Sequence, residues 1–351
     1  MTSAFHPPAA GNAPPRVTVL MSVYNGRAFL ERSLGSILRQ TWRDFEFLII
    51  DNCSTDDGWT FLQARARQDA RIRLLRNERN LGLAASLNRG LQEARGEYIA
   101  RMDADDAARP ARLARQVEFM ERHADVGICG GQILRHVGAQ THVGRYPLSA
   151  EACDVTLLFH ACFPHPAVML RRAALQTGPH FYDARFEQAE DYDLWARMAE
   201  TVRGCNLPHI LLDYYCHPDQ GSGTNYPVVA ERRNLIRQRV VGKLIPEASP
   251  ADLALHHQIG FPQDPFDLDM LERSERWLLR LIEANRAVRR YDEPAMRRVF
   301  AQRWAMLCGQ AAQLGLPVFR RFWASPLRTA AVGPRATAKL LAKCALRKIS
   351  S

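Results

Sequence analysis

The sequence predicts an α/β fold built on a parallel sheet and followed by a helical region. Through roughly the first hundred residues, continuous apolar runs alternate with amphipathic helical patterns, as in successive βαβ units. Beyond about residue 229, helical patterns dominate. Of the 351 residues, 47% are hydrophobic and 24% are charged, which is ordinary for a globular protein with a sizeable buried core.

The first part of the chain contains alternating strand and helix patterns. Strand patterns cover 17–25, 45–52, 71–77 and 98–106, and helical patterns cover 27–40, 58–69 and 83–94. The first, second and fourth strands each end in polar residues, at Tyr24–Asn25, Asp51–Asn52 and Asp103–Asp105. Because the carboxyl ends of parallel strands lie at one edge of a sheet, we expect these side chains to converge on one crevice.

The middle of the chain is mixed and its end is helical. Segments 126–134 and 167–172 have strand patterns, and 189–200 has a helical pattern in which we place Trp195 in the core. Longer helical patterns follow over 229–242, 268–288 and 294–315. These patterns predict a lead over 1–15, an α/β domain over 16–228 and a helical region over 229–351.

The N-terminal lead and the cysteines indicate a cytoplasmic protein. Residues 1–15 are rich in Pro, Ala and Gly, so we expect them to be disordered, and they lack the basic and apolar regions of a signal peptide. No run approaches about eighteen apolar residues, so no membrane span is expected. The eight cysteines are scattered without a CxxC pair, which predicts reduced and mostly buried thiols.

The net charge of +10 resides at the C-terminal end. After Glu293 there are eleven Lys or Arg and no Asp or Glu, which leaves 36 basic and 37 acidic side chains in the rest of the chain. The helical pattern over 336–349 suits a helix lying on an anionic membrane surface, with a solvated basic tail as the alternative. Its cations recur four residues apart, at Lys339, Lys343 and Arg347. No recognition motif suggests a nucleic-acid partner.

Three carboxylates follow the fourth strand within four positions, at Asp103, Asp105 and Asp106. Clustered carboxylate oxygens at the end of a strand are the ligands that a hard divalent cation prefers. Asp-rich turns also cap helices, so the run alone leaves both interpretations open.

The carboxylate run belongs to a longer succession of motifs. The segments VTVLMSVYN, SILRQTWRDFEFLIIDNCSTD, RNERNLGLAASLNRGLQEARGEYIARMDADD and PHPAVMLRR, followed by EDYDLWARMAE, stand in this order between about residues 17 and 220. The succession resembles family-2 glycosyltransferases with the GT-A fold, of the kind that build bacterial surface polysaccharides. The resemblance implies a Rossmann-like domain that transfers a sugar, with inversion, from a nucleotide-diphosphate donor, aided by Mg²⁺ or Mn²⁺. The part beyond about residue 235 resembles only the variable C-terminal regions of such enzymes.

The residue types agree with that chemistry. A sugar-diphosphate leaving group needs its developing charge neutralised, and the acceptor hydroxyl needs a base on the opposite face of the sugar. The resemblance implies that Asp105 is the main metal ligand and that Asp103 contacts the ribose or the metal. We expect Asp106 to cap the helix over 112–121.

The resemblance also implies roles for residues outside the carboxylate run. Asp191 matches the catalytic base, with helix capping as the alternative, and Glu190 would orient the acceptor. His217 resembles a C-terminal histidine that completes the metal or diphosphate site, with a structural role as the alternative. His165 is a further candidate for acceptor contact, although turn architecture also explains the prolines beside it.

The nucleotide-binding candidates lie at strand ends. The resemblance places Ser22 and Tyr24 in the nucleobase pocket, while Asn25 serves the tight turn that follows. Asn80 either approaches the nucleotide or belongs to the entry of the helix that starts near Leu83. Alone, Tyr24 would be an ordinary strand-end residue.

Asp51 and Asn52 bring a departure from the family pattern. Many members have two aspartates here, and the second carboxylate contacts the base, whereas the Asn52 amide offers both a donor and an acceptor. UDP is the favoured nucleotide of the donor, and GDP and dTDP are the alternatives. Arg76 is a candidate for contact with the diphosphate.

The expected function is therefore sugar transfer to a glycan or lipid-linked acceptor in surface polysaccharide synthesis at the cytoplasmic face of the membrane. One alternative is a nucleotidyltransferase that forms sugar nucleotides, but such enzymes carry a Gly-rich loop after strand one, where SVYNGRAF has a single Gly. Another is a non-catalytic glycan- or cation-binding protein, against which Asp191 within EDYDLW argues.

Overall fold

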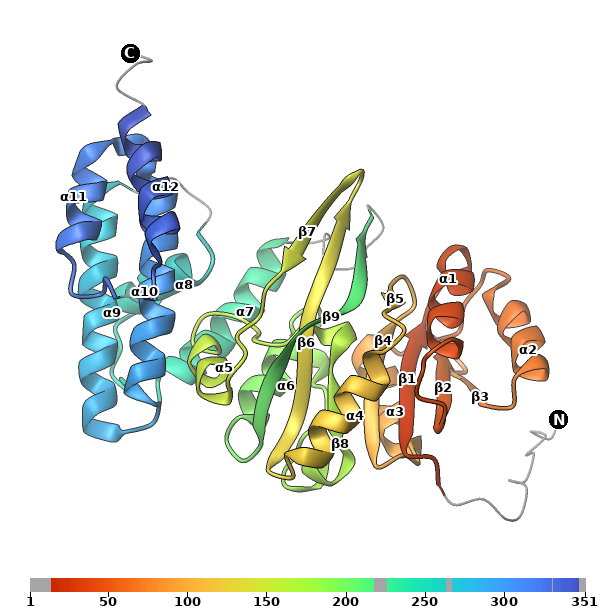
Figure 1. Ribbon diagram of the computed structural model, residues 1–351. Coiled ribbons are helices and arrows are strands. Elements are labelled where there is room, and N and C mark those ends of the chain that lie inside the picture. Colours follow the sequence, from red (N-terminus) through yellow and green to blue (C-terminus); the bar gives the residue numbers. More distant parts are fainter. Residues whose placement is uncertain (1–13, 218–225, 263–266, 330, 347–351) are drawn as a thin grey trace.

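The computed structural model describes residues 14–217, 226–262, 267–329 and 331–346. Figure 1 shows a twisted sheet in the N-terminal part and a bundle of helices at the C-terminal end. Most of the predicted lead, residues 1–13, lies outside the described residues. All eight cysteines are free thiols and six are buried, as predicted. Within the described ranges, no helix combines the length and apolar character needed to cross a bilayer.

Four strands form the parallel part of the sheet, as predicted. Their order is β3 (Ile72–Arg76), β2 (Phe45–Asp51), β1 (Val17–Val23) and β4 (Tyr98–Asp103). Ser22 of β1 is in register with Ile50 of β2 on one side and Asp103 of β4 on the other. The polar ends of these strands therefore meet at one edge, as the sequence indicates.

The rest of the sheet brings distant segments beside β4. The strands are β8 (Met169–Arg171), β6 (Val126–Val137), β9 (Arg203–Cys216), β5 (Ala107–Ala108) and β7 (Gln140–Gly144). β8 runs antiparallel to both β4 and β6, β9 runs parallel to β6, and β5 pairs with the end of β9. The β5–β9 pairing brings the chain after Cys216 next to the turn that follows Asp103.

Helices cover both faces of the parallel strands. Val19 and Met21 of β1 belong to the apolar cluster of α1 and α4, whereas Leu20 belongs to the cluster of α3. This alternation is the period-two pattern of a strand buried on both faces. The helices are α1 (Arg27–Leu38), α2 (Gly58–Gln68), α3 (Leu83–Glu93) and α4 (Arg112–Arg122).

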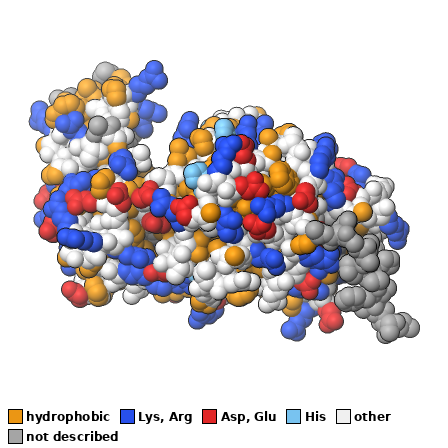
Figure 2. Space-filling model, turned by 60° about the horizontal axis from the view of Figure 1, so that its bottom comes forward, with side chains coloured by type: hydrophobic (Ala, Val, Ile, Leu, Met, Phe, Trp, Pro, Cys, Tyr) orange, Lys and Arg blue, Asp and Glu red, His pale blue; other side chains and the backbone are white. Residues whose placement is uncertain are grey.

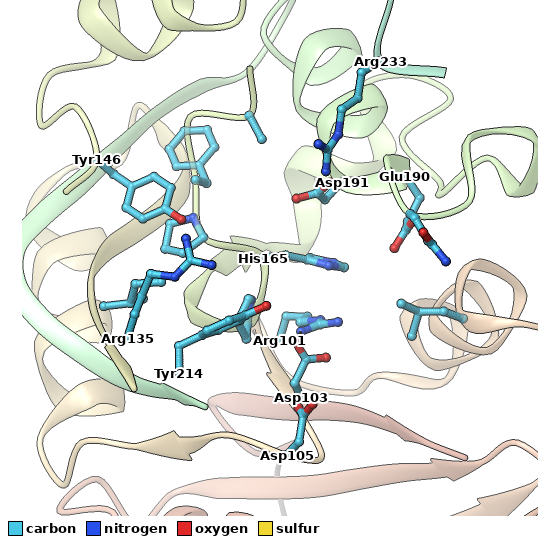
Figure 3. A pocket seen from close by; sticks show the side chains of 17 residues that line it. Arg101, Asp103, Asp105, Arg135, Tyr146, His165, Glu190, Asp191, Tyr214 and Arg233 are labelled. Atoms are coloured by element: carbon cyan, nitrogen blue, oxygen red, sulfur yellow. Dashed lines mark ion pairs between the residues drawn. The ribbon is translucent and has the colours of Figure 1, made fainter. Parts of the chain in front are cut away.

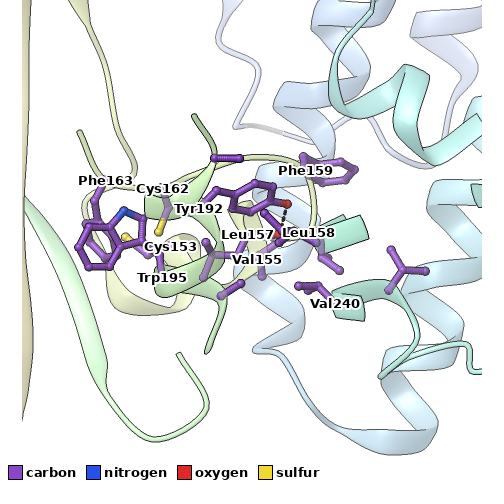
Figure 4. Packing of buried hydrophobic residues seen from close by; sticks show 14 of the residues in the cluster. Cys153, Val155, Leu157, Leu158, Phe159, Cys162, Phe163, Tyr192, Trp195 and Val240 are labelled. Carbon is purple, nitrogen blue, oxygen red and sulfur yellow. Dashed lines mark hydrogen bonds between the residues drawn. The ribbon is translucent and has the colours of Figure 1, made fainter. Parts of the chain in front are cut away.

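Helix α6 (Glu190–Met198) is anchored by its apolar side (Figure 4). Trp195 is fully buried, which confirms its predicted place in the core. The Tyr192 hydroxyl donates a hydrogen bond of 2.7 Å to the Leu157 carbonyl oxygen. Because these side chains fix the helix, its first residues, Glu190 and Asp191, are held in place at its N-terminal end.

Four helices of the C-terminal bundle follow predicted helical patterns, whereas the two over 250–260 and 316–324 were not predicted. Its helices, with α5 before them, are α5 (Ala150–Thr156), α7 (Tyr226–Val241), α8 (Pro250–Gly260), α9 (Leu268–Val288), α10 (Glu293–Gln310), α11 (Leu316–Ala324) and α12 (Pro334–Ala345). α10 ends earlier than the pattern over 294–315 predicts, because the chain tightens there into a 3₁₀ turn. The 3₁₀ segments are η1 (His165–Ala167), η2 (Arg172–Gln176), η3 (Ala184–Phe186) and η5 (Ala311–Leu314).

One apolar cluster joins the sheet to the bundle across the predicted boundary at 228. His256 of α8 is fully buried, and its Nε2 lies 2.7 Å from the Leu158 carbonyl oxygen. The Trp277 indole N–H donates to Nδ1 of the same ring at 3.0 Å, so the histidine is neutral with its proton on Nε2. Burial lowers the pKa of His256 to about 3, which agrees with that state.

Helix α12 corrects part of the tail prediction. Leu340 and Cys344 are buried in the bundle, so these two side chains are not available to a membrane. Leu341 and Leu346 stay exposed. Arg347 lies outside the described residues.

Phe300→Ala tests whether the sheet and the bundle share one core. Phe300 is fully buried and meets Phe159 edge-on at 5.5 Å, so the substitution should lower the free energy of unfolding by about 3–5 kcal/mol. Urea denaturation followed by circular dichroism should show one shifted transition. Phe181→Ala, at an exposed position, should change stability by less than about 1 kcal/mol. Two separable transitions, only one of them shifted, would contradict a shared core.

Candidate functional site

The turn after β4 gathers the three predicted carboxylates. One oxygen from each of Asp103, Asp105 and Asp106 lies within 4.8 Å of the others. The buried guanidinium of Arg101 forms an ion pair with Asp103. Burial raises the pKa of Asp103, and the neighbouring charge of Asp105 adds to that rise. Such a cluster is electrostatically costly unless a cation shares it, so the donor set fits a hard divalent metal ion.

Asp106 is not the helix cap that the sequence predicts. The chain passes through β5 before α4 begins, and the N-cap of α4 is Ala111, without a side-chain hydrogen bond. Asp106 is instead fully buried and accepts a 3.0 Å hydrogen bond from the Tyr215 backbone N–H. Burial, with Asp103 and Asp105 nearby, raises its pKa well above the usual range. Asp106 therefore ties β9 to the acidic turn.

His217 follows β9 and reaches the same turn. Its Nε2 lies 2.9 Å from an oxygen of Asp105, and its ring packs against Phe29 with centroids 4.6 Å apart. The sequence placed this histidine with the carboxylates, and the geometry brings it there. Its role as a metal ligand stays a prediction.

Glu190 and Asp191 lie across a cavity from the acidic turn (Figure 3). The cavity has a volume of about 400 Å³, and Asp103 and Asp105 line its opposite side. The His165 ring lies between the two sets of carboxylates in Figure 3, held by a 2.8 Å hydrogen bond between its Nε2 and the Tyr182 hydroxyl. Burial lowers the pKa of His165 well below its usual value, so this ring is neutral.

The two carboxylates of α6 differ in their environments. Burial raises the pKa of Glu190 to about 7, and the charge of Asp191 contributes to the rise. Burial also raises the pKa of Asp191, but a 2.7 Å hydrogen bond from the Tyr192 N–H and the nearby charge of Arg233 oppose it. The ionised form of Asp191 thus has two supports within the protein. The N-cap of α6 is Ala189, so Asp191 lies in the first turn of the helix and is not its N-cap residue.

A second cavity of about 480 Å³ adjoins the first. Four residues predicted to bind the nucleotide line it, namely Ser22, Tyr24, Asn52 and Asn80, and their contact with a nucleotide stays a prediction. Glu190 lines both cavities, so a ligand in the second can extend toward the carboxylates of the first.

Asn52 holds the loop that forms one wall of this second cavity. Its Oδ1 accepts hydrogen bonds from the Asn77 amide at 2.8 Å and the Leu81 backbone N–H at 2.9 Å. Its Nδ2 donates to Asn80 Oδ1 at 2.7 Å, which also accepts from the Gly82 N–H. Gly82 has φ of +81°, a conformation that favours glycine, and it is the N-cap residue just before α3. Most of the Asn52 amide is therefore engaged within the protein.

Two other residues of the predicted nucleotide-sugar site, Asn25 and Asp51, lie outside both cavities. Asn25 has φ of +49° and forms the tight turn after β1, in line with the turn role expected for it. Asp51 is fully buried and forms an ion pair of 3.0 Å with Arg76, while its Oδ1 has no hydrogen-bond partner among the described residues. Donor contact by Asp51 and diphosphate contact by Arg76 stay predictions.

Several residues that line the first cavity were not predicted from the sequence. Arg101 could have been predicted, because a charged residue within a buried strand needs a partner of opposite charge. The first cavity is also lined by Arg135 of β6, Tyr146 of the loop after β7, Tyr214 of β9 and Arg233 of α7. Only the pairing of distant segments places them there, so no local pattern marks them.

Comparison with known proteins decides the family. The profile described as Glycosyl transferase family 2 matches residues 18–177. The chain is 36% identical over 203 residues to the putative glycosyltransferase EpsE of Bacillus subtilis, covering 57% of this chain and 73% of that protein. The chain belongs to glycosyl transferase family 2. It is also 31% identical over 213 residues to the O-antigen biosynthesis glycosyltransferase WbnJ of Escherichia coli, covering 57% and 80% of the two chains.

Solved structures show the same fold for this glycosyltransferase. Residues 1–349 of TarS from S. aureus, in complex with UDP-GlcNAc, superpose with a TM-score of 0.58 at 15% identity, covering 93% of this chain and 90% of that one. The mannosyltransferase PcManGT from Pyrobaculum calidifontis, in complex with GDP-Man and Mn²⁺, gives 0.52 at 19% identity, with 96% and 88% covered. The predicted GT-A fold is confirmed. Membership of this family favours a glycosyltransferase over the two alternatives, a nucleotidyltransferase and a non-catalytic binding protein.

Asn52→Asp tests the role of Asn52 in the loop. The carboxylate keeps the acceptor bonds but faces Asn80 Oδ1 with an oxygen in place of the donating N–H, so we expect a loss of about 1–3 kcal/mol in the free energy of unfolding. In an Asn80→Ala background the opposing oxygen is gone, and the loss should be smaller. Urea denaturation of the four proteins in a double-mutant cycle measures the difference. Equal losses in both backgrounds would show that the pair is uncoupled.

Proposed function

We propose that this glycosyltransferase moves a sugar, with inversion, from a nucleotide-diphosphate donor to a hydroxyl of a glycan or lipid-linked acceptor. The observation that carries the proposal is the position of Asp191 across one cavity from Asp103 and Asp105 (Figure 3). A single displacement needs the leaving diphosphate and the attacking hydroxyl on opposite faces of the anomeric carbon. The cavity provides one set of carboxylates for each side.

Mg²⁺ or Mn²⁺ fits the leaving-group side. Asp105, Asp103 and His217 would hold the ion, since oxygen and imidazole ligands meet there. When bound, it would supply positive charge to the departing diphosphate. The Mn²⁺ in the PcManGT complex supports this proposal for a protein of the same fold.

Asp191 would act as the base. The Tyr192 N–H and Arg233 favour its ionised form, and that form takes the proton of the acceptor hydroxyl as the new glycosidic bond develops. Glu190 would orient the acceptor. Because its pKa is about 7, its carboxyl group can accept a hydrogen bond when ionised and donate one when protonated.

We propose UDP as the nucleotide, bound in the second cavity. Tyr24 is 51% exposed at the cavity and offers a face on which a base can stack, and Ser22 and Asn80 lie beside it. UDP-GlcNAc in TarS supports a uracil nucleotide, whereas GDP-Man in PcManGT shows that the fold also takes guanine. Since Asn52 is engaged with the loop, Tyr24 and Asn80 are the side chains that we expect to contact the base.

The acceptor proposed is a surface polysaccharide or its lipid-linked precursor at the cytoplasmic membrane face. WbnJ is named for O-antigen biosynthesis, and TuaG of Bacillus subtilis, 35% identical over 128 residues, for teichuronic acid biosynthesis. These names support a polymer-building role for this chain.

The basic C-terminal bundle would contact an anionic membrane. Figure 2 shows basic and hydrophobic side chains side by side on the lobe at the upper left. Lys339 and Lys343 are exposed on α12, and Trp323 of α11 is 52% exposed. Aromatic and basic side chains together suit the lipid headgroup region.

Asp105→Ala and Asp191→Asn test the two sides of the cavity separately. Asp105→Ala should remove metal-dependent hydrolysis or transfer of the donor. Asp191→Asn should still bind UDP but lose transfer by on the order of 10²–10⁴-fold, because only the proton acceptor changes. The measurement is UDP release from a panel of UDP-sugars with and without Mn²⁺. Asp125→Asn, at a position 65% exposed, is the control. Full activity in Asp191→Asn would reject the base assignment.

The membrane proposal is tested by combining Lys339→Glu with Lys343→Glu. These cations are exposed, so the bundle should stay folded while binding to phosphatidylglycerol vesicles weakens by roughly tenfold or more. Co-sedimentation measures the bound fraction. Arg122→Glu with Arg276→Glu is the charge-matched control. Equal sedimentation of both double variants would reject a specific contact through α12.

A further inference from the structure

A third cavity, of about 850 Å³, lies between the sheet domain and helix α10. One wall is the segment from Arg145 to His160, and the other is the face of α10 that carries Arg298 and Arg303. Its lining contains three arginines and no Asp or Glu. Its volume lies within the range of about 300–1,000 Å³ that is usual for ligand sites.

The arginines of this cavity lack counterions within the protein. Arg145 and Arg298 are exposed, and neither forms an ion pair with a described carboxylate. The neighbouring Arg297 on α10, by contrast, pairs with Glu293 at 2.9 Å. Other arginines of the bundle, such as Arg320, also have no ion pair among the described residues, so what distinguishes the groove is that three arginines meet in a lining without Asp or Glu.

Arg303 is the deepest of the three. Its guanidinium lies over the Phe159 ring, 4.8 Å from the centroid, and makes no ion pair with any described residue. Burial, with Arg237 nearby, lowers its pKa to about 10, so it is still charged near neutrality. Holding a cation at a partly buried site without a counterion is costly, and an anionic ligand would offset that cost.

This basic groove meets the reaction cavity at one shared lining residue. Tyr146 lines both, and it is held by a 2.7 Å hydrogen bond from its backbone N–H to Gln132 Oε1. In Figure 3, Tyr146 and Arg135 lie on the side of the reaction cavity opposite Glu190. Arg135 also has no ion pair among the described residues and stacks over Tyr214 at 5.2 Å. Positive side chains therefore extend from the reaction cavity, past Tyr146, to α10.

We propose that this groove binds the acceptor, and that the acceptor carries negative charge away from the reacting hydroxyl. The inference rests on the proposed function, because it assigns the acceptor side of the same reaction. Arginine forks match the oxygens of both carboxylate and phosphate, so an acidic sugar and a phosphate-linked sugar share the chemistry that the groove recognises. Tyr146, at the junction, gives a sugar ring a flat surface on which to pack.

The test is the binding of defined saccharides at saturating UDP and Mn²⁺, which keep the donor site filled. The carboxylate probe is a fluorescent tetragalacturonate, and its methyl ester is the neutral match. The phosphate probe is a citronellyl-diphosphate-linked sugar. Fluorescence anisotropy should show that the wild-type chain binds at least one acidic probe and binds the neutral ester at least tenfold more weakly. Which acidic probe binds identifies the source of the charge.

Charge reversal then locates the site. Arg145→Glu combined with Arg298→Glu should weaken binding of the acidic probe by at least tenfold, and raised salt should weaken binding to the wild type. Arg320→Glu, exposed on α11 outside the groove, is the control and should bind as the wild type does. Equal affinity for the ester, unchanged binding in the reversed variant, or no binding of either acidic probe would overturn the proposal. The increase in Tm caused by UDP in each protein reports on the donor site, so failure there is distinguished from failure of the groove.

Discussion

Three carboxylates that repel one another are held in one turn, and the arrangement of the site depends on that constraint. Asp103, Asp105 and Asp106 approach within 4.8 Å because each has a different support. Arg101 pairs with the first, His217 contacts the second, and a backbone N–H of β9 donates a hydrogen bond to the third. These contacts do not fully offset the negative charge of the three carboxylates, since burial still raises the pKa values of Asp103 and Asp106. A shared cation would offset the rest of that charge, which is the basis for the contact proposed with a diphosphate leaving group.

The opposite side of the cavity depends on packing instead of charge. Trp195 and Tyr192 fix α6 within an apolar cluster that continues into the helical bundle. The bundle therefore has two connections with the chemistry. It anchors the helix that carries Asp191, and through α10 it forms a wall of the basic groove. A C-terminal region whose sequence resembles the family only weakly thus takes part in the site proposed for the acceptor.

Patterns of local periodicity were enough to predict the parallel strands, most helices and the convergence of their polar ends. The motifs around Asp105 and Asp191 were enough to place the two carboxylate sets in one site. Asp106 was misjudged as a cap because the short β5 pairs with β9, a contact no local pattern records. The tail was only partly predicted for a related reason. An amphipathic pattern shows that α12 has an apolar side, but not that Leu340 and Cys344 pack in the bundle. The basic groove joins segments about 150 residues apart, so it could be seen only in three dimensions.

The central claim is that the adjoining cavities form a metal-dependent nucleotide-sugar site. A thermal-shift panel of UDP, GDP, dTDP and their sugars, each with and without Mn²⁺, tests it most directly. We predict that UDP and UDP-sugars raise the Tm more than the other nucleotides do, and that Mn²⁺ enlarges the rise beyond the effect of either ligand alone. A Tm that no nucleotide changes, or a rise caused by UDP that is the same with and without Mn²⁺, would contradict the account.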